Sequence, residues 1–210
     1  MPISVLLVDD HKVVREGYRR LLERDSAFSI IAEASTAESA YRAFCEFQPA
    51  VVVLDVAMPG ASGMDAMRRM LSRDHCARIL VCSMYEDPIY VERSLENGAG
   101  GYVTKAAAAE VLAAAIKAVS RGERYLSHDA ASALARWQKR ERNALASLTA
   151  REMEVLRQIV RGASLVEVAS AMDLSEKTVA NYQTLIRQKL GARNAAQLFQ
   201  VAARLGIDVG

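Results

Sequence analysis

Short apolar runs alternate with longer amphipathic stretches over residues 1–121. The clearest run, residues 51–54, contains three β-branched residues and ends at Asp55, and the Pro-Gly pair at 59–60 predicts a turn soon afterwards. An unbroken apolar run of this length predicts a strand buried on both faces, as in a parallel sheet. The other predicted strands cover residues 3–8, 29–34, 78–83 and 101–104.

Each predicted strand is followed by apolar residues at helical spacing. The predicted helices cover residues 11–23, 35–47, 63–71, 88–97 and 107–121. Ser35 and Glu38 fit a capping box at the start of the second helix, and Asp87 fits the cap of the fourth. Five strands alternating with helices predict a doubly wound α/β fold, in which a parallel five-stranded sheet carries helices on both faces.

The rest of the chain has the pattern of a helical region. Residues 122–147 are too rich in Ala, Leu and Arg for a flexible loop, so they predict a linker with a helix over 128–145. After residue 148, cap residues predict three helices in quick succession, and a last amphipathic helix follows over 195–205. The cap residues are Thr149 with Glu152, Ser164 with Glu167, and Ser175. A short helix, a tight turn and a longer helix predict a helix-turn-helix within 148–210.

Composition and charge narrow the class of protein. The chain is 51% hydrophobic and 25% charged, and no run approaches the ~18 apolar residues of a membrane span, so we expect a globular protein without membrane contact. Three cysteines without a CxxC pair indicate a reducing, cytoplasmic setting. Residues 1–121 hold 14 basic and 16 acidic residues, whereas 122–210 hold 13 and 9. This asymmetry suggests metal or phosphate chemistry first and nucleic acid second, although scatter between two domains explains it equally well.

Polar residues stand at the carboxyl ends of four predicted strands, where ligands bind in open α/β sheets. They are Asp9 with Asp10, Asp55, Ser83 and Lys105. With these five residues, the chain over about 3–121 resembles the receiver domain of bacterial two-component response regulators. The resemblance implies a flavodoxin-like fold and a phosphoacceptor role for Asp55, which acts as the nucleophile.

The same resemblance implies a Mg2+ site. Its ligands would be Asp9, Asp10, Asp55, the backbone carbonyl of Ala57, and water, all of them hard oxygen donors. Three carboxylates would repel an incoming phosphate without such a cation.

Three further residues complete the implied site. Lys105 would act as a point charge for the phosphoryl oxygens, Ser83 would donate a hydrogen bond to them, and Tyr102 would be the switch aromatic. One departure from the family follows Lys105, where Ala106 replaces the usual proline. A cis bond at that position would cost ~3 kcal/mol.

Residues 148–210 resemble the LuxR-type DNA-binding domain. The matching motifs are Leu148-Thr149-x-Arg151-Glu152, Val168-Ala169, Leu174-Ser175-x-Lys177-Thr178-Val179, and Lys189-Leu190-Gly191. A receiver joined to this domain is the architecture of NarL/FixJ-type response regulators. We therefore divide the chain into a receiver domain at 1–121, a linker at 122–147 and a DNA-binding domain at 148–210.

The third helix of this region, which begins after Ser175, is the expected recognition helix. Its spacing turns Val179, Tyr182 and Ile186 toward the core, although Tyr182 also stays among the candidate DNA contacts. The candidate DNA-contacting residues are Lys177, Thr178, Asn181, Tyr182, Thr184, Arg187, Gln188 and Arg193. Among them, Asn181 can pair bidentately with adenine.

These expectations combine into one function. The chain is expected to be a response regulator that a sensor histidine kinase phosphorylates on Asp55 with Mg2+, and that binds double-stranded promoter DNA as a homodimer to control transcription. It would not be an enzyme beyond its own phosphorylation. Two alternatives remain: a DNA-binding regulator that works without phosphorylation, and an Mg2+-dependent aspartyl phosphotransferase or phosphatase.

Overall fold

The computed structural model describes residues 1–58 and 63–207, and it divides into two compact units, residues 1–135 and 136–210. The turn predicted at 59–60 lies outside the described residues. The strands are β1 (Ile3–Val8), β2 (Phe28–Ala34), β3 (Val51–Leu54), β4 (Ile79–Ser83), β5 (Gly101–Thr104) and β6 (Tyr125–Leu126). The helices of the first unit are α1 (Lys12–Leu22), α2 (Ala37–Phe47), α3 (Gly63–Arg73), α4 (Pro88–Glu96) and α5 (Ala108–Ser120).

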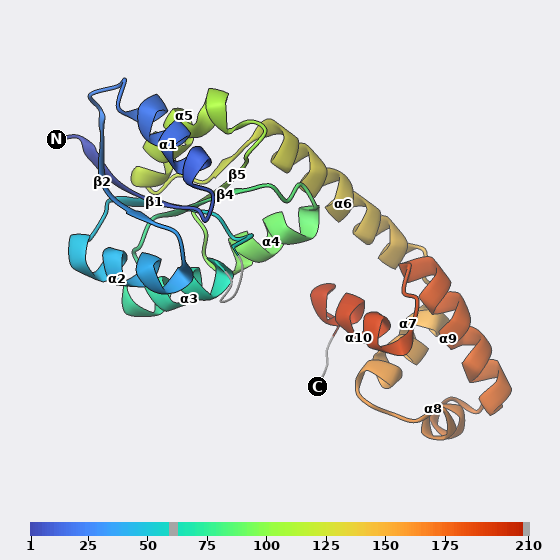
Figure 1. Cartoon of the computed structure of the whole chain (residues 1–210). Coiled ribbons are helices and arrows are strands. Elements are labelled where there is room, and N and C mark those ends of the chain that lie inside the picture. The colour runs from blue at the N-terminus through green and yellow to red at the C-terminus, as the bar shows by residue number, and fades with distance from the viewer. Residues whose placement is uncertain (59–62, 208–210) are drawn as a thin grey trace. The chain divides into compact units, whose positions relative to one another are not determined.

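The first unit is built on one parallel sheet with the strand order β2-β1-β3-β4-β5-β6. Helices α1 and α5 cover one face, and α2, α3 and α4 cover the other (Figure 1). All four residues of β3 are buried, as the unbroken apolar run predicts. The doubly wound α/β prediction is therefore confirmed.

Two local predictions are corrected. The sheet has six strands rather than five, because β6 pairs in parallel with Gly101 and Tyr102 of β5. At the start of α2 the capping box consists of Thr36 and Ser39, not Ser35 and Glu38. Thr36 Oγ1 accepts a hydrogen bond from the Ser39 N–H, and Ser39 Oγ accepts one from the Thr36 N–H.

The second unit is helical. Helix α6 (His128–Ala146) crosses the boundary between the units, and α7 (Ala150–Val160), α8 (Leu165–Met172), α9 (Glu176–Leu190) and α10 (Ala195–Arg204) follow. Helix α9 packs against α7, α8 and α10 around an apolar core that includes Val155, Leu156 and Ile186. Both capping boxes predicted for α7 and α8 form, and Ser175 caps α9. The turn between α8 and α9 passes through Asp173 in the left-handed conformation, so this pair forms the predicted helix-turn-helix.

Among the described residues, no helix has both the length and the apolar character that crossing a membrane requires.

Candidate functional site

The carboxyl ends of the central strands place the predicted polar residues at one edge of the sheet. The Asp55 N–H donates to the Val8 carbonyl at 2.8 Å, and the Lys105 N–H donates to the Ser83 carbonyl at 2.8 Å. Both hydrogen bonds extend the ladder one residue beyond the strands. The backbone of Asp55 and Lys105 is therefore fixed by the sheet, while their side chains are free to face the site.

Lys105 holds two carboxylates together. Its Nζ lies 2.5 Å from Asp9 Oδ2 and 2.7 Å from Asp55 Oδ2, and the three side chains are 6%, 4% and 1% exposed respectively. Burial alone would lower the pKa of Lys105, but the hydrogen bonds to Asp55 and Asp9 outweigh burial and raise it. The ammonium therefore remains charged and offsets part of the negative charge of the pocket.

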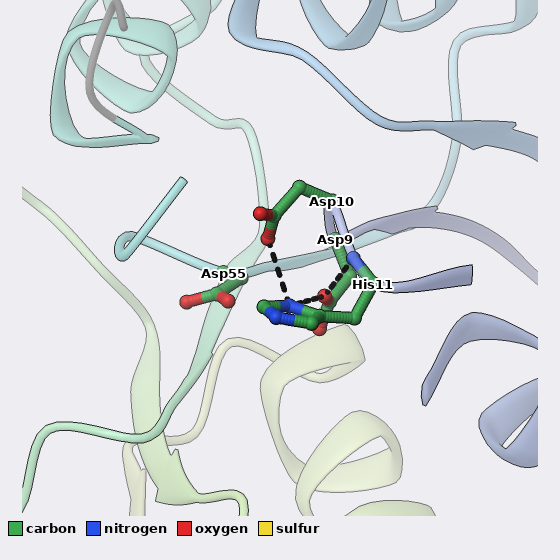
Figure 2. Close-up of side chains that lie close together, drawn as sticks. All are labelled: Asp9, Asp10, His11 and Asp55. Atoms are coloured by element: carbon green, nitrogen blue, oxygen red, sulfur yellow. Dashed lines mark hydrogen bonds and ion pairs between the residues drawn. The ribbon is translucent and has the colours of Figure 1, made fainter. Parts of the chain in front are cut away.

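Asp10 and His11 complete an acidic cluster with Asp9 and Asp55. One potential ligand atom from each of the four residues lies within 4.8 Å of the others. Dashed lines in Figure 2 join the His11 ring to Asp9 and Asp10, at 3.3 and 3.0 Å from their Oδ1 atoms. Asp10 Oδ1 is buried and accepts no hydrogen bond from the described residues. Clustered carboxylate oxygens, one of them buried and facing the exposed His11 ring without a hydrogen bond, fit a hard divalent cation such as Mg2+.

Ala57 contacts the site through its backbone. Its N–H donates to Asp55 Oδ1 at 2.8 Å, so both carboxylate oxygens of Asp55 accept a hydrogen bond, the second from Lys105. The ligand role of the Ala57 carbonyl stays a prediction. The peptide bond between Lys105 and Ala106 is trans, like every other peptide bond of the described chain.

Ser83 and Tyr102 are both fully buried, and both contact Tyr85. Ser83 Oγ accepts a hydrogen bond from the Tyr85 N–H at 3.3 Å, and the Tyr102 hydroxyl donates to the Tyr85 carbonyl at 2.6 Å. Burial raises the pKa of Tyr102, which keeps its hydroxyl neutral and able to donate. The two predicted residues therefore meet at one short segment after β4.

Three residues at this site were missed by the sequence reasoning. His11 joins the acidic cluster, and its position directly after Asp9 and Asp10 was an available signal. Arg15 donates to the Asp9 carbonyl at 2.6 Å. Gly63 begins α3, where an added Cβ would meet the Asp55 carbonyl and lie 2.7 Å from Val56 Cα. The contacts of Arg15 and Gly63 form only in the folded chain, so the sequence carries no local signal for them.

The predicted DNA-contacting residues lie on α9 and just after it. Lys177, Asn181, Thr184, Gln188 and Arg193 are exposed. The others are less accessible. Thr178 is half-buried in the cap with Ser175, Arg187 is half-buried beside Thr184, and Tyr182 packs against the core. The packing of Tyr182 favours its core role over a DNA contact.

Comparison with known proteins identifies both parts of the chain. Residues 5–117 match the family model described as response regulator receiver domain, and residues 146–202 match that of bacterial regulatory proteins, luxR family. The chain is 32% identical to the response regulator UvrY of Escherichia coli strain K12 over 209 residues, covering 98% of this chain and 95% of that protein. It is 32% identical to the response regulator GacA of Pseudomonas aeruginosa over 208 residues, covering 98% and 97%.

A crystal structure agrees with these matches. A two-component response regulator of the LuxR family from Aurantimonas sp. SI85-9A1 superposes with a TM-score of 0.64 and 40% identity, over 66% of this chain and 99% of that one. The matches reach from the parallel sheet to the helix-turn-helix, so the chain belongs to the two-component response regulators that carry a LuxR-type DNA-binding domain.

Proposed function

We propose that this response regulator is phosphorylated on Asp55 in a Mg2+-dependent reaction with a partner histidine kinase, and that the phosphoryl group controls its binding to promoter DNA. The observation that carries the proposal is the contact between Asp55 and Lys105. A carboxylate that is 1% exposed stands at the end of β3, 2.7 Å from a buried ammonium, beside Asp9 and Asp10. This arrangement supports transfer of a phosphoryl group to a carboxylate nucleophile.

Asp10, Asp9 and Asp55 would hold the cation, with the Ala57 carbonyl as a further donor. When bound, Mg2+ supplies positive charge that offsets the repulsion between these carboxylates and the incoming phosphoryl group. Asp10 is the strongest candidate ligand, because its Oδ1 is buried and accepts no hydrogen bond from the described residues, with the exposed His11 ring 3.0 Å away.

The transfer itself requires little from the protein beyond position and charge. A carboxylate oxygen of Asp55 attacks the phosphorus atom of a phosphohistidine, the P–N bond breaks, and the imidazole leaves with a proton from solvent. Lys105 then pairs with a phosphoryl oxygen in addition to Asp55. The chain performs no reaction on an outside substrate in this proposal.

Ser83 and Tyr102 would convert the new charge into a movement. Ser83 Oγ accepts from the Tyr85 N–H, and a rotation of its hydroxyl toward a phosphoryl oxygen weakens that contact. Tyr102 holds the carbonyl of the same residue. A change at Ser83 therefore alters the segment that Tyr102 contacts, which is the kind of two-state element that phosphorylation biases.

The second unit supplies the output. Helix α9 would enter the major groove with Lys177, Asn181, Thr184 and Gln188, which are its exposed candidates. We propose that two copies bind a site with two-fold symmetry, with phosphorylation setting the affinity.

Labelling with a small phosphodonor tests the assignment. Wild-type protein should incorporate acid-labile phosphate only with Mg2+, and both Asp55→Asn and Asp10→Asn should abolish labelling, through loss of the nucleophile and of a cation ligand respectively. Asp65→Asn, which changes an exposed carboxylate on α3, is the matched control and should label normally. Mg2+-dependent label that persists in Asp55→Asn would contradict the site.

A gel-shift series with and without phosphodonor tests the output. Phosphorylation should change the affinity of the wild-type chain for promoter fragments but leave Asp55→Asn unaffected. Equal affinity in both states of the wild-type chain would instead support a regulator that works without phosphorylation.

A further inference from the structure

Arg15 links the acidic cluster to the neighbouring strand without belonging to the cluster. It lies near the start of α1, and its side chain is 14% exposed. Its Nη1 donates to the Asp9 carbonyl at 2.6 Å, and its Nε donates to Glu33 Oε2 on β2 at 3.2 Å. One guanidinium therefore ties the end of β1 to β2, using the fixed fork of donors that lysine lacks.

The position of the Asp9 carbonyl affects Asp10, because the carbonyl belongs to the peptide unit that joins the two residues. The carbonyl oxygen, the Asp10 nitrogen and the Asp10 Cα lie in one rigid plane. A hydrogen bond that fixes this oxygen therefore also fixes where Asp10 Cα stands and the direction in which its side chain leaves. The Asp9 N–H is held in turn by the Ala34 carbonyl at 3.1 Å.

Asp10 depends on this backbone more than Asp9 does. The Asp9 carboxylate has its own supports, Lys105 Nζ at 2.5 Å and the His11 N–H at 2.8 Å. By contrast, Asp10 Oδ1 accepts no hydrogen bond from the described chain, and the His11 ring 3.0 Å away is 66% exposed. The main chain is therefore the principal support for the Asp10 carboxylate.

We propose that Arg15 is a positioning residue that sets the divalent-cation affinity of the site by fixing the Asp9–Asp10 peptide. Glu33 orients the guanidinium for this task. The inference rests on the proposed function and deepens it, because it adds a residue that touches neither the cation nor the phosphoryl group.

Arg19 separates this role from a purely structural one. It lies one turn later on α1 and binds the same carboxylate, with its Nε 2.6 Å from Glu33 Oε1, but its other ion pair is with Glu23. If Arg15 served only to join α1 to β2, removal of either arginine would have the same effect on the site.

Binding of Mn2+, which accepts the same oxygen ligands, measures the effect directly through the free-ion signal in electron paramagnetic resonance. In the full-length chain, Arg15→Met should raise the Mn2+ dissociation constant roughly tenfold, as is common when a residue that orients a metal ligand is lost. Arg19→Met should stay within about twofold of wild type. Phosphodonor labelling of Arg15→Met should return at correspondingly higher Mg2+, because Asp55 is intact.

The outcomes separate the two hypotheses. If wild-type protein binds no Mn2+, or if its Mn2+ binding persists in Asp10→Asn, the proposed cation site itself is wrong. If wild type binds Mn2+ but Arg15→Met matches either wild type or Arg19→Met, the Arg15 inference alone is wrong. Should Arg15→Met fail to fold by circular dichroism, Arg15→Lys decides: its ammonium lacks the fork of donors, so affinity should fall severalfold, and wild-type affinity would overturn the inference.

Discussion

At the scale of single residues, Lys105 determines the charge balance of the receiver site. Its ammonium pairs with two carboxylates that are almost inaccessible to water. Its pKa is raised above 10.5, so this stabilisation is complete at neutral pH and is lost only as the pH rises through the raised value. Lys105 therefore keeps its positive charge when the negative charge in the site changes.

Helix α9, the proposed recognition helix, has few charges, so the proposed roles of two of its exposed residues can be tested separately. Lys177 and Asn181 are both exposed on α9, one a cation and the other an amide that can pair with a base edge. A phosphate contact contributes to binding on any sequence and to the salt dependence, whereas a base contact contributes only on the preferred site.

We expect Lys177→Ala to weaken binding on operator and scrambled duplexes alike, and to flatten the slope of log affinity against log salt by about one unit. Asn181→Ala should cost roughly 1–3 kcal/mol on the operator and spare the scrambled duplex. Fluorescence anisotropy over a salt series measures both effects. Equal losses on both duplexes for Asn181→Ala would show that this residue only positions the helix.

Much of the receiver site could be predicted because its residues share one sequence signature. Asp10, Asp55, Ser83 and Lys105 each follow an apolar run, and the carboxyl ends of parallel strands meet at one edge. Arg15 has no such signature, since an arginine on a helix is ordinarily a solvated residue. Its contact with a backbone carbonyl depends on how α1 packs beside β2, which a single sequence does not encode locally.

At the scale of elements, the predicted helices and strands were mostly confirmed, and the misses have physical causes. β6 contains two residues, too few for a periodicity of two to be recognised. It forms because Gly101 leaves room for it: an added Cβ there would lie 2.5 Å from the Tyr125 carbonyl. The caps of α7, α8 and α9 were predicted correctly because each depends on residues only three apart.

One ion pair joins two helices of the DNA-binding domain. Glu152, at the start of α7, is 5% exposed, and Lys189 near the end of α9 places Nζ 2.8 and 2.7 Å from its two oxygens. The hydrogen bonds from Lys189, and then from the Thr149 backbone, lower the pKa of Glu152 below its ordinary 4.5. Because the pKa is lowered on folding, this stabilisation is present above pH 4.5 and is lost as the pH falls through the lowered value.

Lys189→Met should therefore reduce the free energy of unfolding by about 2 kcal/mol at pH 7, because a buried carboxylate loses its charged donor. The difference in unfolding free energy between Lys189→Met and wild type should shrink as the pH falls below 4.5. Urea unfolding followed by circular dichroism of the helices measures it. Arg157→Met removes an exposed pair with Glu154 on the same helix and should cost under about 0.5 kcal/mol. A loss for Lys189→Met that is independent of pH would contradict the ionic explanation.

At the scale of the whole molecule, the chain divides its chemistry between two units. The acidic cluster and Lys105 belong to the first, and the exposed face of α9 belongs to the second. The charge asymmetry of the sequence agrees with this division. Helix α6 crosses the boundary at 135 and is attached to the receiver at its beginning, where the Thr104 hydroxyl donates to Asp129 and the Thr104 N–H donates to Ser127 Oγ at 3.3 Å.

This attachment predicts where the receiver can be separated from the rest. A fragment of residues 1–135 should unfold cooperatively and stay monomeric without phosphodonor, whereas a fragment of residues 1–121 should unfold at lower urea and self-associate. Urea unfolding and light scattering measure the two properties. Equal stability and equal mass for the two fragments would contradict the prediction.

The reason lies in what β6 covers. Without residues 125–127, β5 becomes the edge strand of the sheet. The carbonyls of Gly100 and Tyr102, which accept hydrogen bonds from the N–H groups of Tyr125 and Ser127, then lose their partners. An exposed edge strand of this kind is a template on which a second chain can add a strand. A segment that connects two domains therefore also protects the sheet against aggregation. Mutations in the linker can lower the yield of soluble protein without changing either the acidic cluster around Asp55 or the exposed face of α9.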